Sequence, residues 1–354
     1  MPSFKENRKT VTALDVANFA GVSIATVSRV FNKSDNVSDE MRNKVLNAIN
    51  ILGFRPSRTA QRLRARRSLV IGLIISDIQN PFFTSVVRGI EDVAHQKEYS
   101  VILCNSDEDP EKERLYIDVM RSEEVAGVII TIASQATEYI ERLIVSGIPV
   151  VAMDRSIKHH QIDSVSVENT VGAYQAVSYL IEKGHRQIGF IGLPLELTPG
   201  KERQDGYINA MRDHGLELNS DLMCVGDARQ ESGFKCTNEL IDIGIPMTAI
   251  FSSNNLMTLG ALGAIMGKGL SIPEDISLIG FDDMPWAPYI CPPLTAVAQP
   301  TYELGRRAAE LLMRRIANPE EVRESVRLKT RLIIRDSVAS PSVRNTEVNA
   351  GALG

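Results

Sequence analysis

The 354-residue sequence contains no long apolar run and no recognisable cysteine framework. No stretch approaches the ~18 consecutive apolar residues that a membrane-spanning helix needs, and the first thirty residues lack the apolar segment of a secretory signal. The four cysteines are scattered, without Cys-x-x-Cys spacing: Cys104, Cys224, Cys236 and Cys291. We therefore expect a cytoplasmic protein without a membrane partner, whose cysteines are reduced and mostly buried thiols.

The common signatures of nucleotide-binding enzymes are also missing. There is no Gly-x-Gly-x-x-Gly after an apolar run and no Gly-Lys-Ser/Thr loop. The five histidines show no metal-ligand spacing, and His185 in "EKGHRQIGFIG" precedes an apolar run, where it is better interpreted as a turn and packing residue than as a general base. We expect no enzymatic activity, no metal and no cofactor.

Positive charge is concentrated at the amino-terminal end. Residues 1–68 hold 13 Lys and Arg against 5 Asp and Glu, a net charge of +8, whereas the rest of the chain carries a net −13. A basic head on an acidic body indicates a polyanionic partner for the head alone. A solvated basic tail would have the same charge, so the residue pattern has to decide between them.

Three short amphipathic patterns make up the head. A capping box begins at Thr12, Ser23 and Ser38 are N-cap residues for two further helices, and Gly53 ends the third. The residues expected to face inward are Leu14, Val16, Ala17, Ala20, Val27, Val30, Phe31, Met41, Val45, Ala48, Ile49 and Leu52. Two short helices joined by a turn at Gly21 and backed by a third predict a helix-turn-helix.

The second of these helices has an outer face suited to DNA. Its outward residues are Ile24, Ala25, Thr26, Ser28 and Arg29. Small residues at the start of the helix allow it to enter a major groove, Arg29 can read a guanine, and Thr26 and Ser28 suit phosphates. Together with the charge of the head, this pattern predicts binding to double-stranded DNA.

A basic segment, "RPSRTAQRLRARRS", follows the head. A helix over residues 58–64 would span about two turns and be marginal alone. Leu63 is its one large apolar residue and is surrounded by arginines, among them Arg64. The segment is either a basic linker or a helix that folds on DNA and inserts Leu63 into a minor-groove base step.

From Leu69 onward, apolar runs alternate with helical patterns. The runs are "LVIGLIIS", "SVILCNS", "GVIIT", "IPVVAMD", "SVSVEN", "QIGFIGL", "AIFSS", "ISLIGFDD" and "LTAVAQP". Strands alternating with helices predict parallel sheets covered on both faces, and roughly ten strands suit two sheets better than one. Ligands of such sheets bind beyond the carboxyl ends of the strands. Polar residues stand at those ends (Asp77, Asp154, Arg155, Asn254 and Asp282), although aspartate is also a common turn residue.

These motifs together resemble the LacI/GalR (lactose-repressor/galactose-repressor) family of transcriptional regulators. The resemblance rests on "TALDVANFAGVSIATVSRVFN", "GFRPSRTAQRLR", "SLVIGLIISDIQNPFF" and "GFDDMPWAPYICPPLTAVAQP" and extends to "RLIIRDS". It implies a homodimer on a near-palindromic operator, with a paired hinge helix that carries Leu63 into the DNA. The expected location is therefore the nucleoid in the cytoplasm.

The resemblance also implies a domain plan and a fold class. An all-α helix-turn-helix head would occupy residues 10–56, and a hinge residues 57–68. An α/β two-lobed core like a type I periplasmic binding protein would occupy residues 69–340, and a disordered tail residues 341–354. Lobe 1 would comprise about 69–168 and 299–327, and lobe 2 about 169–298 and 328–340, with crossovers near Glu168, Gln299 and Arg327.

Effector-binding positions of the family match residues of this chain. They are Arg203, Asp154, Asn254, Asp282 and Gln299, with Phe82 and Phe83 as an aromatic lip. Ala228 departs from the family where several members have a stacking aromatic, which weakens the case for a purine. Trp286 either supplies a stacking face instead or packs at the lobe surface or the dimer contact. Arg155 either reads an anionic group together with Arg203 or pairs structurally with Asp154 or Asp282. The expected effector is a sugar, a sugar acid or a sugar phosphate.

Two alternatives belong to other classes of protein. A two-lobed solute-binding protein would share the core but would not need the basic head. An α/β enzyme would need the catalytic or nucleotide signatures that the sequence lacks.

Overall fold

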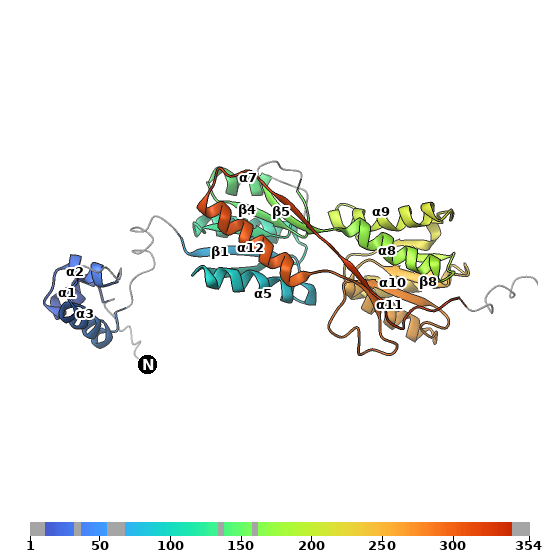
Figure 1. Cartoon of the computed structure of the whole chain (residues 1–354), viewed down its shortest axis with the longest axis horizontal. Helices are drawn as coiled ribbons and strands as arrows, with labels where there is room; N and C mark the ends of the chain where they lie inside the picture. Colours follow the sequence, from blue (N-terminus) through green and yellow to red (C-terminus); the bar gives the residue numbers. More distant parts are fainter. Residues whose placement is uncertain (1–10, 32–36, 55–67, 134–137, 158–161, 342–354) are drawn as a thin grey trace, which may run out of the picture. The chain divides into compact units, whose positions relative to one another are not determined.

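A computed structural model describes residues 11–31, 37–54, 68–133, 138–157 and 162–341. The chain divides into two compact units, residues 1–68 and 69–354, which are described separately below (Figure 1). The predicted hinge contacts Leu63 and Arg64, and nearly all of the predicted tail, lie outside the described residues. None of the described helices combines the length and apolar character that crossing a membrane requires.

The head is a three-helix unit made of α1 (Ala13–Ala20), α2 (Ile24–Phe31) and α3 (Asp39–Leu52). Thr12 and Asp15 form the predicted capping box, and Ser23 Oγ accepts a hydrogen bond from Thr26 N at 3.1 Å. Gly21 and Gly53 end α1 and α3 with φ of 67° and 62°, a left-handed conformation that glycine adopts without a steric penalty. The predicted helix-turn-helix is confirmed.

Six apolar side chains form the core of the head. They are Val16, Ala17, Val27, Val30, Val45 and Ala48. Leu14 and Met41 were also expected in this core, but their side chains are 52% and 47% exposed. Leu14 lies two residues before Val16, about 200° away around the helix, and Met41 lies in the first turn of α3, before the buried stripe begins.

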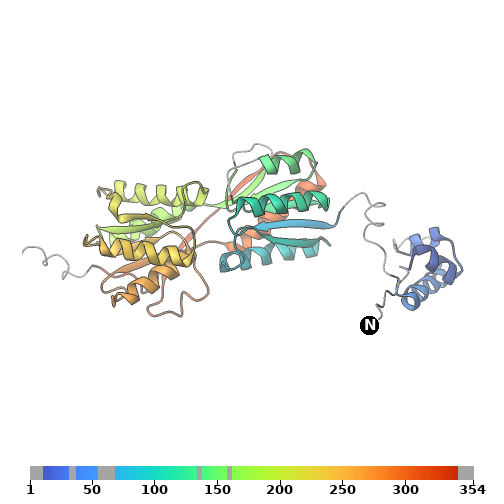
Figure 2. The ribbon, with the colours of Figure 1, turned by 180° about the vertical axis from the view of Figure 1, so that it is seen from behind.

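The core unit contains two six-stranded sheets (Figures 1 and 2). Sheet A has the order β11-β5-β4-β3-β1-β2, with β1 (Val70–Ile75), β2 (Ser100–Asn105), β3 (Gly127–Ile130), β4 (Val150–Met153), β5 (Asp163–Val167) and β11 (Ser325–Leu328). Sheet B has the order β12-β10-β9-β8-β6-β7, with β6 (Ile188–Gly192), β7 (Met223–Val225), β8 (Ala249–Ser252), β9 (Ser277–Phe281), β10 (Thr295–Ala298) and β12 (Arg331–Ile333). All strand pairs are parallel except β10 with β12.

Helices cover both faces of each sheet. Sheet A packs against α5 (Pro81–Gln96) and α12 (Thr301–Ala317) on one face and against α6 (Pro110–Ser122) and α7 (Glu138–Val145) on the other. Sheet B packs against α8 (Asn169–Glu182) and α9 (Thr198–Asp213), and against α10 (Gln230–Asp242) and α11 (Asn255–Gly267). A short 3-10 helix, η1 (Ser220–Leu222), precedes β7. All nine apolar runs form strands, and burial on both faces explains the runs of the central strands, whereas β2 at the edge of sheet A is only partly buried.

The chain passes between the two sheets three times. It crosses at Glu168, between β5 and α8; at residues 299–300, between β10 and α12; and at residues 329–330, between β11 and β12. We call the part built on sheet A lobe 1 and the part built on sheet B lobe 2. The third crossing, from β11 to β12, is the dark red segment that runs diagonally between the lobes in Figure 1.

The cysteine prediction was wrong in part. Cys224 of β7 and Cys236 of α10 form a disulfide with their Cα atoms 5.6 Å apart. Of the two remaining thiols, Cys104 is partly buried, which raises its pKa, and Cys291 is exposed. The pair was not predicted because the close approach of β7 and α10 leaves no motif in the sequence.

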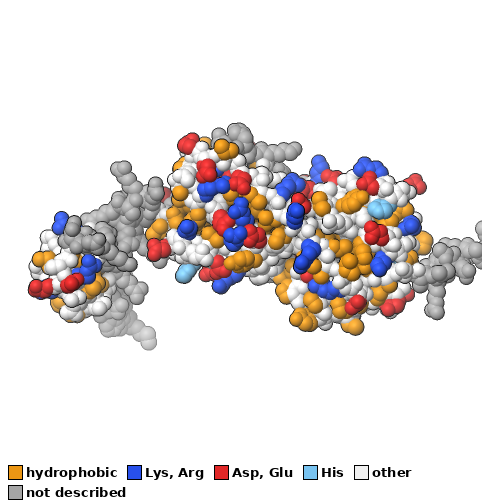
Figure 3. Space-filling view, viewed as in Figure 1, with side chains coloured by type: hydrophobic (Ala, Val, Ile, Leu, Met, Phe, Trp, Pro, Cys, Tyr) orange, Lys and Arg blue, Asp and Glu red, His pale blue; other side chains and the backbone are white. Residues whose placement is uncertain are grey.

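The charged side chains on α12 form ion pairs with residues that are near in the sequence. Arg306 contacts Glu303 and Glu310, and Arg314 contacts Glu324 at 2.7 Å. Figure 3 shows basic and acidic side chains interspersed over this face of lobe 1. The acidic excess of the core is therefore not concentrated here.

One buried ion pair fastens α12 to sheet A. Arg315 donates to both carboxylate oxygens of Asp163 at 2.9 and 3.1 Å, and both side chains are almost fully buried.

Asp163→Ala would leave the guanidinium buried without its counter-charge, so we expect the free energy of unfolding to fall by about 3–5 kcal/mol. Urea unfolding of the core measures this. Glu91→Ala, which removes an exposed partner of Arg88, should cost less than about 1 kcal/mol. Equal effects of the two substitutions would contradict the assignment.

Candidate functional site

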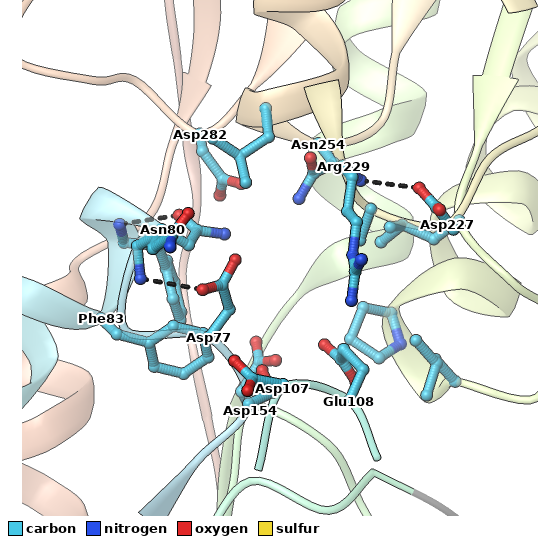
Figure 4. Close-up of a pocket in the computed structure, with 18 of the residues that line it drawn as sticks. Asp77, Asn80, Phe83, Asp107, Glu108, Asp154, Asp227, Arg229, Asn254 and Asp282 are labelled. Atoms are coloured by element: carbon cyan, nitrogen blue, oxygen red, sulfur yellow. Dashed lines mark hydrogen bonds between the residues drawn. The ribbon is translucent and has the colours of Figure 1, made fainter. Parts of the chain in front are cut away.

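A cleft of 910 Å³ lies at the carboxyl ends of strands from both lobes (Figure 4). Its walls come from the loops that follow β1, β2 and β4 in lobe 1 and β6, β7, β8 and β9 in lobe 2. All eight predicted effector positions line it: Phe82, Phe83, Asp154, Arg155, Arg203, Asn254, Asp282 and Gln299. The structure therefore gathers in one place residues that are up to 217 positions apart in the chain.

Asp154 and Asp282 occupy equivalent positions in the two lobes. Asp154 follows β4 and Asp282 follows β9, with φ of 66° and 80°. Aspartate tolerates this left-handed conformation better than most residues, and such conformations cluster at functional sites. Both residues are buried, Asp154 with 8% and Asp282 with 6% exposure, yet both line the cleft.

Burial also perturbs the ionisation of these two carboxyls. Loss of water raises the pKa of Asp154 to about 6, although Arg155 and Arg203 favour its charged form. Burial likewise raises the pKa of Asp282, against the opposing effects of Arg203 and a hydrogen bond from Gln299. No described hydrogen bond reaches the Asp154 carboxylate, so it needs a donor from a bound molecule or from water.

Arg203 is held rigidly in the cleft wall. It is 3% exposed; its Nε donates to Asn169 Oδ1 at 2.9 Å and its Nη1 to the Ser253 carbonyl at 2.7 Å. The guanidinium carbon lies 3.7 Å from the centroid of the Phe281 ring. Burial lowers the pKa of Arg203, whereas Asp282 and Asp154 raise it. The guanidinium remains a cation with further N–H groups for a ligand.

The main partner of Arg155 is Glu108, which the sequence did not suggest, and the suggested pair with Asp154 is present but longer. Its Nη1 and Nη2 donate to Glu108 at 2.6 and 2.5 Å, and Nη1 also donates to the Ile132 carbonyl at 2.6 Å. Asp154 lies only within charge contact, 3.8 Å from Nε. The structural alternative for Arg155 therefore fits the geometry, with Glu108 as the counter-charge. Glu108 follows β2, whose loop lies beside that of β4 in space but 47 residues away in sequence.

Two amides complete the polar lining. Asn254 accepts a hydrogen bond from Met257 N at 3.0 Å, which caps α11, and its side chain points into the cavity (Figure 4). Gln299 donates to Asp282, while its Oε1 is buried without a partner in the described structure. Both amides therefore have capacity left for a ligand.

The aromatic part of the site lies on one side only. Phe82 and Phe83, at the start of α5, pack edge to face at 5.0 Å and line the cleft. Trp286 packs partly buried against the core of lobe 2 and does not line the cleft, whereas Ala228 does. The cleft therefore offers an apolar contact but no pair of rings to sandwich a flat base.

Several cleft residues were absent from the predicted site. The loop after β2 supplies Asp107, Glu108, Asp109 and, in α6, Lys112; the loop after β7 supplies Asp227, Arg229 and, in α10, Glu231. Their position after strands was the available signal, but β7 itself was not predicted. In total, eight acidic and four basic side chains line the cleft. The cleft thus holds an excess of four acidic side chains, of the thirteen in residues 69–354.

Polar contacts connect the two lobes around the cleft. Asn255 Nδ2 donates to Asn80 Oδ1 at 2.7 Å, and both side chains are buried. Behind Arg203, Asn169 Nδ2 donates to Glu202 at 3.0 Å, and Glu202 accepts from Arg327 of β11 at 2.7 Å. An unbroken chain of hydrogen bonds thus runs from the cleft to a strand beside the third crossing.

In the head, the predicted DNA-facing side of α2 is open. Ile24 is 43% exposed, and Ala25 and Arg29 are also exposed. Thr26 and Ser28 are partly buried, and the Thr26 hydroxyl is 3.0 Å from Ser23 Oγ. By their helical spacing, Ile24, Ala25, Ser28 and Arg29 lie on one surface of α2, whose start is capped by Ser23.

Comparisons with known proteins agree with both units. Residues 12–57 match the family described as "Bacterial regulatory proteins, lacI family", and residues 68–336 match "Periplasmic binding proteins and sugar binding domain of LacI family". The chain belongs to the LacI family. The predicted family and fold class are confirmed, and the protein is a DNA-binding transcriptional regulator of the effector-responsive kind.

Individual relatives extend over almost the whole chain. The HTH-type transcriptional repressor PurR of Mannheimia succiniciproducens is 34% identical over 92% of this chain and 98% of its own. A transcriptional regulator CelR–cellobiose complex is similar with a TM-score of 0.72 and 31% identity, over 92% and 99% of the two chains. A lac repressor dimer bound to operator and the anti-inducer ONPF has a TM-score of 0.83 and 29% identity, over 94% and 100%.

The raised pKa of Asp154 gives a prediction about stability. The pKa of Asp154 is 3.8 in an ordinary environment and about 6 in the folded protein. Between these two pH values the folded protein binds a proton that the unfolded chain has lost. Ionisation of Asp154 therefore destabilises the ligand-free fold as the pH rises. Asp154→Asn should therefore stabilise the core at pH 7.5, by up to about 3 kcal/mol, and by only about 1 kcal/mol at pH 4.5. Urea unfolding at the two pH values measures the difference.

Asp107→Asn is the matched control. Asp107 also has a positive φ, of 53°, but hydrogen bonds from Lys112 and Asn105 lower its pKa. This substitution should give no gain at pH 7.5. A gain equal to that of Asp154→Asn would show that asparagine merely suits the left-handed backbone.

Proposed function

We propose that this protein is a repressor that binds a near-palindromic operator as a homodimer and changes its DNA affinity when a small neutral sugar occupies the cleft. Each chain supplies one recognition helix, α2, and therefore reads one half-site, so two chains are needed for affinity and spacing. The operator places its action at the nucleoid, in the cytoplasm. We propose no catalytic activity for it.

The charge of the cleft favours a neutral effector over a sugar acid or sugar phosphate. Glu108 neutralises Arg155, and Arg203 faces both Asp154 and Asp282. A further negative charge would enter a site in which acidic groups outnumber basic ones by eight to four. Sugar hydroxyls can donate to the carboxylates and accept from Arg203 and Asn254 without that penalty.

The observation that carries this proposal is the meeting of all eight predicted positions in one cleft of a chain that also has a helix-turn-helix head. A solute-binding protein would share the cleft but would have no use for the head. The sugar-bound relative, the CelR–cellobiose complex, supports the choice of ligand class.

A route for coupling follows from the contacts behind Arg203. Effector binding to Arg203 acts on Asn169 and Glu202 and, through them, on Arg327 near the third crossing. A shift between two arrangements of the lobes would change the separation of the two hinge segments of a dimer. The coupling free energy need be only about 1–3 kcal/mol, a 5- to 150-fold change in operator affinity.

Arg203→Ala tests the effector half of the proposal. Fluorescence polarisation with an operator duplex selected from a random pool would be repeated with neutral sugars, sugar acids and sugar phosphates. We expect the variant to bind the duplex like the wild type but to lose its response to the sugar. Arg212→Ala, on the exposed side of the same helix, should respond normally. Loss of operator binding in folded Arg203→Ala, or a response of the wild type to an anionic sugar alone, would contradict the proposal.

Leu63→Ala tests the DNA half. Leu63 and Arg64 lie outside the described residues, and we propose that Leu63 enters a minor-groove step of the operator while Arg64 contacts the DNA beside it. The substitution should weaken binding to the selected duplex much more than binding to an unrelated one. Leu69→Ala, an exposed leucine just before β1, should change neither. Equal losses on both duplexes would exclude the wedge.

A further inference from the structure

The single disulfide of the described residues encloses one wall of the cleft. Cys224 lies in β7 and Cys236 in the second turn of α10, 12 residues further on. Between them, the five consecutive residues 227–231 all line the cleft. Cys104 and Cys291, the two free cysteines, do not line it.

The enclosed segment is weakly supported on its β-strand side. β7 is three residues long, stands at the edge of sheet B and pairs only with β6. Its counterpart in lobe 1, β2, pairs with β1 over six residues. After β7, the chain is held by Gly226 N, which donates to the Gly192 carbonyl at 2.8 Å, and by Asp227 N, which donates to Ser232 Oγ at 3.1 Å.

The α10 side of the segment is firmly placed. Gly233 of α10 and Gly260 of α11 allow these two helices to approach closely. A Cβ added at either glycine would lie within 2.2 Å of a backbone oxygen of the other helix. Cys236 is 4% exposed and packs in the core of lobe 2. The disulfide therefore ties a short edge strand to a fixed helix, and it restrains the turn at Ala228, whose φ is 70°.

We propose that Cys224–Cys236 is a reversible thiol–disulfide site whose oxidised form fixes the cleft segment 227–231 and whose reduced form loosens this segment and weakens effector binding. The second part of this statement rests on the proposed function of the cleft. The first part concerns only this chain and stands without it.

The chemistry needs a dithiol reductant. Its thiolate attacks Cys224 Sγ, the more accessible sulfur; the Sγ–Sγ bond breaks, and the electron pair passes to Cys236 Sγ, which takes a proton from water. The second thiol of the reductant then attacks the mixed disulfide, becomes oxidised to a disulfide with the first, and releases Cys224. Glu239 Oε2, 3.6 Å from Cys224 Sγ, can accept the S–H of the released thiol.

Hydrogen exchange of the full-length protein, read by mass spectrometry with and without dithiothreitol, tests the first part. We expect reduction to speed exchange of the amides of residues 225–232, while the loop after β2 in lobe 1 stays unchanged. The double variant Cys224→Ser/Cys236→Ser should exchange at the reduced rate in both conditions. Cys104→Ser/Cys291→Ser, the matched control, should behave like the wild type. Unchanged exchange on reduction, or a dithiothreitol effect that persists without Cys224 and Cys236, would overturn the proposal.

The second part is read from two affinities measured in both redox states. The affinity for the operator duplex without sugar should be the same, and the affinity for the responsive neutral sugar should fall at least about fivefold on reduction. If exchange rises but sugar affinity is unchanged, the regulatory part is overturned. If neither state binds a specific duplex, the proposed function fails, and the exchange result still decides the redox site.

Discussion

The cleft depends on the balance of a small group of charges removed from water. Glu108 takes up the charge of Arg155, which leaves Arg203 facing the two buried carboxylates of Asp154 and Asp282. Removing such groups from water costs several kcal/mol each unless partners replace the solvent. Burial is the main reason why the pKa of Asp154 rises to about 6, and the nearby Asp282 and Glu108 raise it further, against Arg155 and Arg203. The surplus negative charge indicates that a ligand must bring hydrogen-bond donors rather than another anion.

The fold places these charges by repeating one arrangement twice. Asp154 and Asp282 end corresponding strands of the two sheets, each with a left-handed backbone and each with its N–H donated to the next strand, at Val165 and Val297. Each lobe has cores of its own, and the lobes are connected by three crossings of the chain and by polar contacts such as Asn80–Asn255. A ligand held by both lobes can therefore favour one relative arrangement at modest cost in free energy.

Much of the fold was predictable because central parallel strands are buried on both faces and appear as uninterrupted apolar runs. The strands β7, β11 and β12 were missed because they are short edge or crossing strands with exposed residues. The strand-end rule and the family resemblance selected eight residues that do line one cleft, although their role in binding stays a prediction. Glu108 was missed as the partner of Arg155 because it lies 47 residues away and follows β2, which β3 and β1 separate from β4 in sheet A.

In the proposed function, ionised carboxylates of the cleft receive the hydroxyls of a neutral effector. Titration calorimetry of the responsive sugar near pH 6, in buffers of different ionisation enthalpy, counts the protons exchanged on binding. Because hydrogen bonds to a carboxylate favour its ionised form, binding should release part of the proton that free Asp154 holds near its pKa of about 6. The release should fall as the pH rises well above 6, and Asp154→Asn should lose the part that Asp154 contributes. Proton uptake on binding, or no exchange near pH 6, would contradict the account.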